Sequence, residues 1–316
     1  MADYTPMMKQ YLEMKKANPG SILFFRLGDF YEMFFEDAKI ASRELELTLT
    51  GKDCGQAERA PMCGVPFHSY ESYVARLVAR GYKVAICEQT EDPATAKGLV
   101  KRDIVRVLTP GTVIEGSMLD ESRNNYLASL YMAPGTERCG LCFCDCSTGS
   151  IQVTELDGEE VNLRISNELG RFNPSEILAN PAMAENREVK SFIENRLHSR
   201  LECRPQEEYD PQTDRATVAA QYPTSTPEQL GLNGREAALC ALGAALRYLK
   251  QTQMTGLERL AEPVWYSDTQ YMKLDLTARR NLELLETMRA KEKRGSLLGV
   301  LDRTRTAMGK RLIRVW

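Results

Sequence analysis

The chain has 316 residues, of which 43% are hydrophobic and 27% charged, a balance typical of soluble proteins with about two or three domains. A pI near 5.7 argues against a simple basic nucleic-acid binder. The sequence contains no run of about 18 consecutive apolar residues, so no membrane span is predicted. Nine scattered cysteines and an N-terminus without a signal-peptide pattern indicate reduced thiols in the cytoplasm. Charge is uneven: residues 117–250 carry 13 Lys+Arg and 20 Asp+Glu, whereas residues 251–316 carry 13 and 8.

The first elements predict a small mixed α/β domain that ends near residue 112. Thr5-Pro6 is an N-cap followed by an N1 proline, and apolar residues at helical spacing follow as far as Asn18. Further helices are expected at about 31–45 and from a cap at Ser69 to a stop at Gly81. Strands are expected at 21–27, 82–87 and 104–108, and residues 50–64 are expected to be irregular.

A polar linker at 113–125 is expected to lead into a second domain at 126–250. Apolar runs predict strands at 126–132, 140–146 and 150–155, the last two joined at Ser147-Thr148-Gly149. Helix and strand signals then alternate at 159–169, 176–178 and 189–197, before an Ala/Leu-rich helix at 236–249. Three opening strands followed by this alternation resemble an RNase H-like layout.

From about residue 255 the pattern becomes helical. A strong helix is expected at 275–289, with shorter helical pieces at 296–301 and 308–316. The chain ends at Val315-Trp316 inside such a pattern, without a cap, glycine or proline. This ending predicts a helical domain that is only partly contained in the chain.

A family resemblance rests on Gly28-Asp29-Phe30-Tyr31-Glu32-Met33-Phe34 and on further segments in fixed order. Those segments are TPMMKQYL at 5–12, PMCGVPFH at 61–68, VAICEQ at 84–89, DPATAKG at 92–98, RVLTPGT at 106–112, DCSTG at 145–149 and LDLTARRNLEL at 274–284. Together they resemble the N-terminal part of bacterial MutS-type DNA mismatch-repair proteins, over essentially the whole chain.

The resemblance implies a multi-domain α/β protein. A small mixed α/β mismatch-binding domain would occupy 1–112, an RNase H-like α/β connector 126–250, and the start of an all-helical lever and core domain 255–316. The family's C-terminal ATPase, with its ATP and Mg²⁺, would lie outside this chain, so no cofactor is expected here. Implied partners are mismatched duplex DNA, a MutL-type protein on the connector, and a second copy in the complete protein. A monomer is left open for this chain, and no membrane partner is expected.

In that family the Phe-x-Glu pair recognises the mismatch, so the resemblance implies that Phe30 and Glu32 bind mismatched DNA. A mismatch stacks and pairs poorly, and an apolar wedge in the minor groove detects how easily the duplex deforms. A phenylalanine ring stacks on any base without hydrogen bonding to it, which suits this task. Beside DNA phosphates, Glu32 is expected to become a neutral acid that can donate a hydrogen bond to a base.

Phe30 and Glu32 also have a purely structural interpretation. Phe30 could be a core aromatic at a strand–helix junction, and Glu32 could be an acid in the first turn of a helix. The heptapeptide alone favours that interpretation, whereas the ordered set of segments favours DNA recognition. Among the basic residues in loop-like stretches, Lys52 is the strongest candidate for a phosphate contact. Solvated surface charge is favoured over a phosphate contact for the others, Arg59, Lys97, Lys101 and Arg102.

Two other motifs in the sequence suggest different functions, a zinc site and a nuclease. Cys139, Cys142, Cys144 and Cys146 lack a second ligand pair nearby, so buried cysteines on a strand are favoured over a zinc site. Asp145 could be the metal-binding aspartate of a nuclease, but a turn-forming role is favoured.

No Gly-x4-Gly-Lys-Ser/Thr pattern occurs in the chain, so no catalytic residue, metal site or ATP hydrolysis is expected here. Two other functions stay open: an acidic docking platform for a protein in the middle domain, and a metal-dependent nuclease at 126–250.

Overall fold

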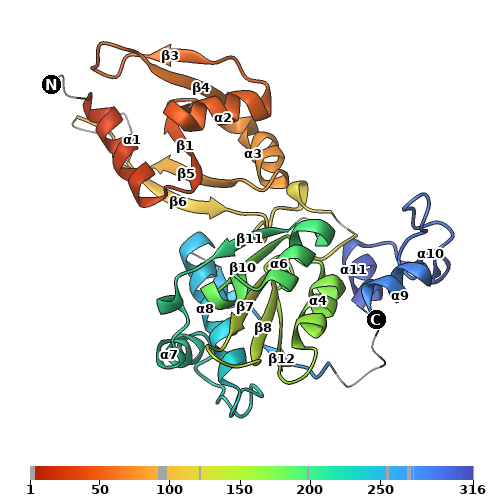
Figure 1. Ribbon diagram of the computed structural model, residues 1–316. Coiled ribbons are helices and arrows are strands. Elements are labelled where there is room, and N and C mark those ends of the chain that lie inside the picture. The colour runs from red at the N-terminus through yellow and green to blue at the C-terminus, as the bar shows by residue number, and fades with distance from the viewer. Residues whose placement is uncertain are drawn as a thin grey trace. The chain divides into compact units, whose positions relative to one another are not determined.

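A computed structural model describes residues 4–91, 98–120, 122–197, 199–253, 256–268, 272 and 274–315. The chain divides into two compact units, Met1–Pro110 with Gln251–Thr255, and Gly111–Lys250 with Gly256–Trp316. Each unit is built around its own mixed β-sheet (Figure 1). The expected class, a multi-domain α/β protein, is therefore confirmed.

The first unit has a sheet with strand order β3-β4-β2-β1-β5-β6. Its elements are α1 (Pro6–Ala17), β1 (Ser21–Leu27), β2 (Phe30–Phe34), α2 (Phe35–Leu45), β3 (Thr50–Lys52), β4 (Ala60–Pro66), the 3-10 turn η1 (Phe67–Ser69), α3 (Tyr70–Ala79), β5 (Lys83–Gln89) and β6 (Arg102–Leu108). All neighbouring strands are antiparallel except β1 and β5, which are parallel.

Helix α1 packs on one face of this sheet through aromatic and ionic contacts. The predicted cap is confirmed, because the Thr5 side chain accepts a hydrogen bond from the Met8 amide. Tyr11 lies edge-on to Phe25, with ring centroids 5.6 Å apart. Its hydroxyl donates to the buried Asp37 carboxylate, which also pairs with Lys15 at 2.7 Å. A strong electrostatic contact thus joins α1 to α2 beside the core.

Two expectations for this unit are wrong. The helix expected from residue 31 begins only at Phe35, because Phe30–Phe34 forms strand β2 between β1 and β4. The segment 50–64, expected to be irregular, supplies β3 and most of β4. Ser69 does lie at the N-cap of α3, but its side chain makes no capping hydrogen bond.

The second unit has a sheet with strand order β11-β10-β7-β8-β9-β12. Strands β7, β8 and β9 form an antiparallel meander, and β10 pairs parallel with β7, as the RNase H-like expectation requires. Its elements are η2 (Gly116–Met118), β7 (Tyr126–Met132), β8 (Cys139–Asp145), β9 (Ser150–Leu156), α4 (Val161–Phe172), β10 (Glu176–Ala179), α5 (Pro181–Ala184), α6 (Arg187–Phe192), the π-helical turn η3 (Ile193–Leu197), β11 (Arg200–Cys203), η4 (Gln206–Glu208), α7 (Pro211–Gln221), α8 (Glu236–Gln253), η5 (Leu257–Arg259) and β12 (Val264–Trp265).

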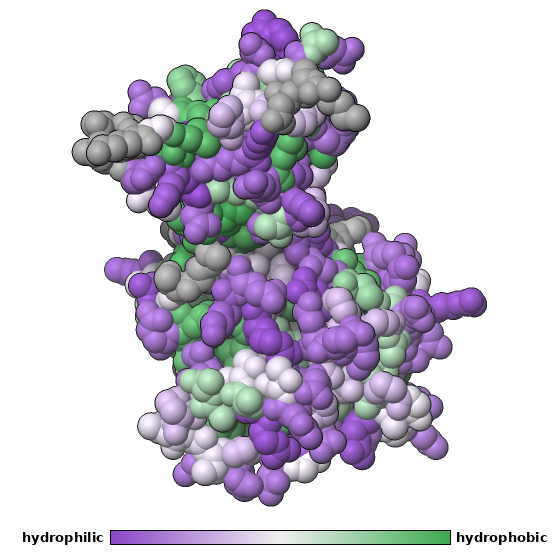
Figure 2. All heavy atoms as spheres, turned by 90° about the vertical axis from the view of Figure 1, so that its left-hand side faces the viewer, coloured by the Kyte–Doolittle hydropathy of each residue, from purple (hydrophilic) through white to green (hydrophobic). Residues whose placement is uncertain are grey.

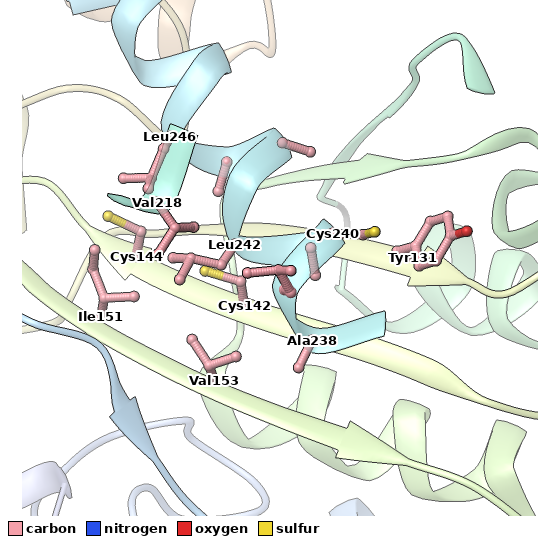
Figure 3. Close-up of a cluster of buried hydrophobic side chains, with 14 of the residues drawn as sticks. Tyr131, Cys142, Cys144, Ile151, Val153, Val218, Ala238, Cys240, Leu242 and Leu246 are labelled. Carbon is pink, nitrogen blue, oxygen red and sulfur yellow. The ribbon is translucent and has the colours of Figure 1, made fainter. Parts of the chain in front are cut away.

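Helices cover both faces of this second sheet. On one face α7 and α8 bury Cys142, Cys144, Ile151 and Val153 (Figure 3). On the other face α4, α5 and α6 pack against the intervening strand positions such as Phe143. Strand β8 is buried along its whole length, which explains its continuous apolar sequence.

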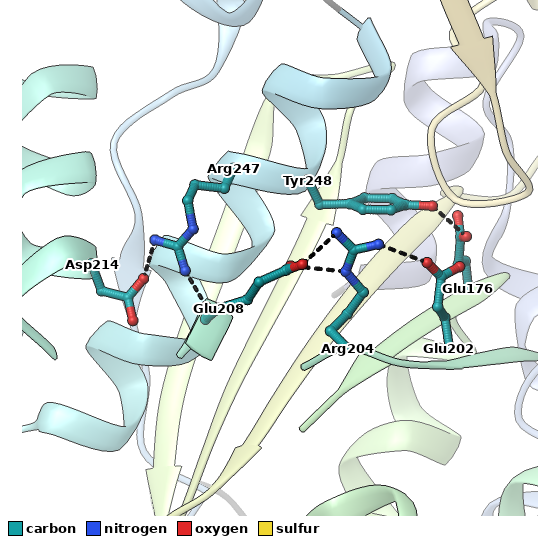
Figure 4. Close-up of polar contacts among 7 residues, drawn as sticks. All are labelled: Glu176, Glu202, Arg204, Glu208, Asp214, Arg247 and Tyr248. Carbon is teal, nitrogen blue, oxygen red and sulfur yellow. Dashed lines mark hydrogen bonds and ion pairs between the residues drawn. The ribbon is translucent and has the colours of Figure 1, made fainter. Parts of the chain in front are cut away.

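A polar network runs along the side of α8 and reaches the first residue of this unit (Figure 4). Arg247 on α8 pairs with Asp214 on α7, and the Tyr248 hydroxyl donates to Glu176 at 2.7 Å. Glu176 is fully buried and also accepts a hydrogen bond from the Gly111 amide at 3.1 Å. A side chain at Gly111 would come within 2.8 Å of Glu176, so the close approach requires glycine.

The C-terminal part of this unit contains three short helices, of which the first is much shorter than expected. They are α9 (Leu276–Asn281), α10 (Leu297–Leu301) and α11 (Ala307–Val315). The helix expected at 275–289 is therefore wrong beyond Asn281, where Glu283 takes a positive φ of 49°. Apolar residues expected along this helix are exposed, among them Leu282 and Leu285. A helix this amphipathic depends on packing of its apolar face, and that packing is lacking here.

Candidate nucleic-acid interface

A tight hairpin between β1 and β2 presents Phe30 at its tip. Leu27 pairs with Phe30 across a two-residue turn, Gly28-Asp29, in which Gly28 takes a φ of +58°. A two-residue hairpin of this kind needs a positive φ at its first central position, which glycine adopts without strain. The turn therefore fixes where Phe30 begins the second strand.

The Phe30 side chain is 48% exposed, whereas its neighbours Tyr31 and Met33 are buried. The structural interpretation of Phe30 as a core aromatic is therefore wrong. Hydrophilic side chains cover most of the molecular face shown in Figure 2, with apolar residues in separate groups. Single exposed apolar residues are common on proteins, so exposure alone assigns no role to this ring. Its place at a hairpin tip, with polar groups beside it, makes it a candidate binding residue.

Glu32 lies on the same face of β2 as Phe30, because alternate residues of a strand point to the same side. Its Oε2 lies 2.5 Å from the Lys52 ammonium on β3, and the Glu32 side chain is 16% exposed. Gly64 is the partner of Glu32 on β4, and a Cβ atom at that position would lie 3.5 Å from Glu32 Cγ. The glycine therefore leaves room for the Glu32 side chain. Since α2 starts at Phe35, the alternative role of Glu32 in a first helical turn is wrong.

The other basic residues differ in how far they can reach a ligand. Lys101 and Arg59 are exposed, and the Lys52 side chain is 32% exposed. Lys97 lies outside the described residues. Arg102 is only 9% exposed, and its guanidinium donates to the Arg26 carbonyl, the Gln10 side chain and the Val100 carbonyl. These contacts give Arg102 a structural role in joining α1, β1 and β6.

Two residues beside the hairpin turn, Arg26 on β1 and Phe67 after β4, were not predicted as site residues from the sequence. The Arg26 guanidinium carbon lies 3.7 Å from the centroid of the Phe67 ring, and Phe67 is 38% exposed. The Phe67 amide donates to the Asp29 carbonyl at 2.9 Å. The sequence offers only a weak signal, since Phe67 lies in the family-like segment 61–68 and Arg26 lies two residues before Gly28, and only the strand register brings them together.

The cysteines and Asp145 of the second unit have the structural roles favoured from the sequence. Cys139, Cys142 and Cys144 are buried and free, and Cys146 is partly exposed. The Asp145 carboxylate accepts hydrogen bonds from the Ser147 amide at 2.9 Å and from Asn124, which fixes the turn after β8. Among the described residues, no group of three His, Cys, Asp or Glu side chains is placed to hold a metal ion.

Comparison with known families covers both units. The family model for MutS domain I matches residues 5–117, that for MutS domain II matches 125–261, and that for MutS domain III matches 277–316. The protein named DNA mismatch repair protein MutS from Acetivibrio thermocellus is 48% identical over 316 residues, which is 100% of this chain. The chain belongs to the MutS family. The resemblance seen in the sequence is thereby confirmed.

Other MutS relatives agree in extent. The MutS proteins of Ruminiclostridium cellulolyticum and Lachnoclostridium phytofermentans are 48% and 47% identical, over 100% and 99% of this chain. The chain spans 36% of the length of the first of these and of the Acetivibrio protein, and 33% of the Lachnoclostridium one. The β1–β2 hairpin lies within MutS domain I, and α9, α10 and α11 lie within or close to MutS domain III.

Proposed function

We propose that this MutS chain recognises mismatched or unpaired bases in duplex DNA by inserting Phe30 from the minor groove. The observation that carries the proposal is an exposed phenyl ring at the tip of a tight hairpin, with the Glu32 carboxylate two residues behind it on the same face. The relatives' name, DNA mismatch repair protein, supports the choice of ligand. Phe30 and Glu32 would lead the contact, with Lys52 and Lys101 as candidate phosphate contacts.

Insertion of an aromatic ring distinguishes mismatched from paired DNA, because the free energy needed to unstack a base step depends on how well the bases pair. Unstacking one base step costs about a few kcal/mol in paired DNA and less where pairing is already weak. Stacking of the ring on a base returns about 1–3 kcal/mol whatever the base is. The balance therefore favours mismatches in general, which suits a protein that must accept many of them.

Glu32 would add a polar contact to the displaced base. A carboxylate can only accept a hydrogen bond, whereas the neutral acid can also donate one to a purine N7 or a pyrimidine carbonyl. Nearby phosphates and loss of solvent both favour the neutral form. In the DNA-free chain the carboxylate is instead paired with Lys52, so this pair must open before Glu32 reaches a base.

Fluorescence anisotropy with G·T and G·C duplexes at one ionic strength tests the proposal. Phe30→Ala should reduce the preference for the G·T duplex about ten- to hundredfold, as expected from lost stacking. Val105→Ala, at a 44% exposed position on β6, is the matched control and should leave the preference unchanged. An unchanged preference in Phe30→Ala would contradict the proposal.

The remaining expectations from the family belong to the same proposal. In the complete protein a MutL-type partner would bind the connector, two copies would act together on DNA, and a distant ATPase would use ATP and Mg²⁺. The excess of acidic residues at 117–250 supports a protein partner for this unit over direct DNA contact. A cytoplasmic location is proposed as well; no helix in the described part of the chain is long and apolar enough to cross a membrane.

A further inference from the structure

We propose that Arg26 is a positioning residue that braces the β1–β2 hairpin, so that Phe30 enters DNA as a rigid wedge. The inference rests on the proposed insertion of Phe30. The new element is that the stiffness of the hairpin tip depends on Arg26, a side chain that does not touch the mismatch. Two features of Arg26 support this role: the groups that its guanidinium contacts and the face of the sheet on which it lies.

Both carbonyls of the turn are held by hydrogen bonds from outside it. The Arg26 Nε donates to the Gly28 carbonyl at 2.5 Å, and the Phe67 amide donates to the Asp29 carbonyl at 2.9 Å. The same Arg26 guanidinium stacks on the Phe67 ring. One planar cation thus ties the turn to the segment that follows β4, a geometry that arginine can provide and lysine cannot.

The brace is anchored further back on β5. Arg26 Nη1 lies 3.7 Å from Glu88 Oε1, and the Tyr31 hydroxyl donates to the same carboxylate. Burial raises the pKa of the Tyr31 phenol, so this hydroxyl stays protonated and keeps donating. Arg26 is only 16% exposed and is therefore poorly placed to act as an ordinary phosphate contact.

Arg26 and the inserted ring lie on opposite faces of the sheet. Arg26 is the cross-strand partner of Tyr31, so the two side chains share one face, and Phe30 and Glu32 occupy the other. The brace therefore supports the tip from behind without blocking the face offered to DNA. A turn that had to become ordered during binding would lower the affinity for mismatched DNA, and a turn that is already held avoids this cost.

A double-mutant cycle tests the brace in the chain with G·T and G·C duplexes. Arg26→Lys and Arg26→Ala should each lower the G·T preference about tenfold or more, because the turn loses its stacked, hydrogen-bonded support. In a Phe30→Ala background the Arg26 substitution should have no further effect on that preference. Arg43→Lys is the matched control, since Arg43 is 71% exposed on α2 and pairs with the adjacent Glu44.

The outcomes separate the two proposals. If Phe30→Ala removes the preference while Arg26→Ala leaves it intact, or if the two effects multiply independently, the brace is wrong and the wedge stands. If Phe30→Ala has no effect, the wedge is wrong and the brace falls with it.

Amide hydrogen exchange in DNA-free protein gives a second readout that does not depend on binding. Arg26→Lys should speed exchange of the Phe67 amide at least about tenfold while the β5 amides keep their protection, which shows that the fold persists. Unchanged exchange at Phe67 would overturn the proposal.

Discussion

Lys52 and Glu32, two residues expected to touch different parts of DNA, are paired with each other in the free chain, with 2.5 Å between Nζ and Oε2. The pair reaches across β4, because Glu32 on β2 is the partner of Gly64 and Lys52 on β3 is the partner of Ala60. A phosphate that attracts the Lys52 ammonium would release the carboxylate beside it. Under the proposed function, a phosphate contact at Lys52 would therefore free Glu32 for a contact with a base.

Replacing Lys52 should weaken DNA binding without erasing selectivity. Lys52→Met removes one phosphate contact, so affinities for G·T and G·C duplexes should fall alike. The slope of log affinity against log salt concentration should fall by about 1. Lys52→Arg, which keeps the charge, is the control and should keep the slope. Anisotropy titrations over a range of salt concentrations check this, and a loss confined to the mismatched duplex would contradict it.

Glu32 variants should separate the donor role of this residue from its charge. Glu32→Gln carries an amide that can donate to a base, so it should keep more mismatch preference than Glu32→Ala. Glu32→Ala should lose about tenfold in preference, the worth of a typical hydrogen bond, with little loss of G·C binding. Competition titrations with G·T and G·C duplexes measure both quantities. Equal losses of G·T and G·C affinity in Glu32→Ala would exclude the proposed base contact.

Asp214 should make the second unit less stable as the pH rises. Burial raises the pKa of this carboxyl from 3.8 to about 6, although Arg247 opposes the shift. A carboxyl with a raised folded-state pKa contributes stability below its unfolded value, and that contribution is lost as the pH passes 6. Relative to wild type, Asp214→Asn should therefore gain about 2 kcal/mol between pH 4.5 and pH 7.5.

Urea unfolding of wild type and Asp214→Asn at these two pH values measures the gain. Asp214→Asn also loses the ion pair with Arg247, which shifts its free energy of unfolding at both pH values. The comparison therefore uses only how the difference between the two proteins changes with pH. Asp210→Asn is the control, because hydrogen bonds from Thr213 lower the pKa of Asp210 and this carboxyl therefore stays ionised at both pH values, so its difference from wild type should hardly change with pH. A constant difference between wild type and Asp214→Asn at the two pH values would show that Asp214 is not perturbed in this way.

The cysteines should behave as structural thiols. Cys203 is exposed and should react first with a disulfide reagent such as DTNB, and Cys203→Ser should remove that fast phase. Cys142 and Cys144 should react only on unfolding, because both are buried and both thiols have a raised pKa, Cys142 through burial and Cys144 through its hydrogen bond with Cys146 and then burial. EDTA should leave all rates unchanged; faster labelling at Cys142 or Cys144 after chelation would revive the zinc interpretation.

Sequence patterns located the elements whose signals are local. The Thr5 cap, the β7–β8–β9 meander and the turn-forming role of Asp145 all follow from short stretches of sequence and are confirmed. The start of α2 was missed because Phe30–Phe34 is apolar and contiguous with a helical pattern, and only pairing with β1 and β4 makes it a strand. Tertiary pairing overrides such local preference.

The candidate site was predicted only in part, for a similar reason. The family resemblance identified Phe30 and Glu32, and their assignment to DNA remains a prediction. Neither the ion pair of Glu32 with Lys52 nor the stack of Arg26 on Phe67 could be foreseen, because each joins residues distant in sequence through strand register. The burial of Arg102 was likewise hidden, since its partners come from α1 and β1.

The hydrogen bond from the Gly111 amide to Glu176 fixes the first residue of the second unit. The chain passes from the first unit to the second at Pro110-Gly111, and Gly111 is fastened at once to a buried carboxylate that Tyr248 also holds. The second unit therefore begins at a residue that is held from within the same unit. One buried carboxylate thus closes the stretch of chain that runs from Gly111 to Tyr248 near the end of α8.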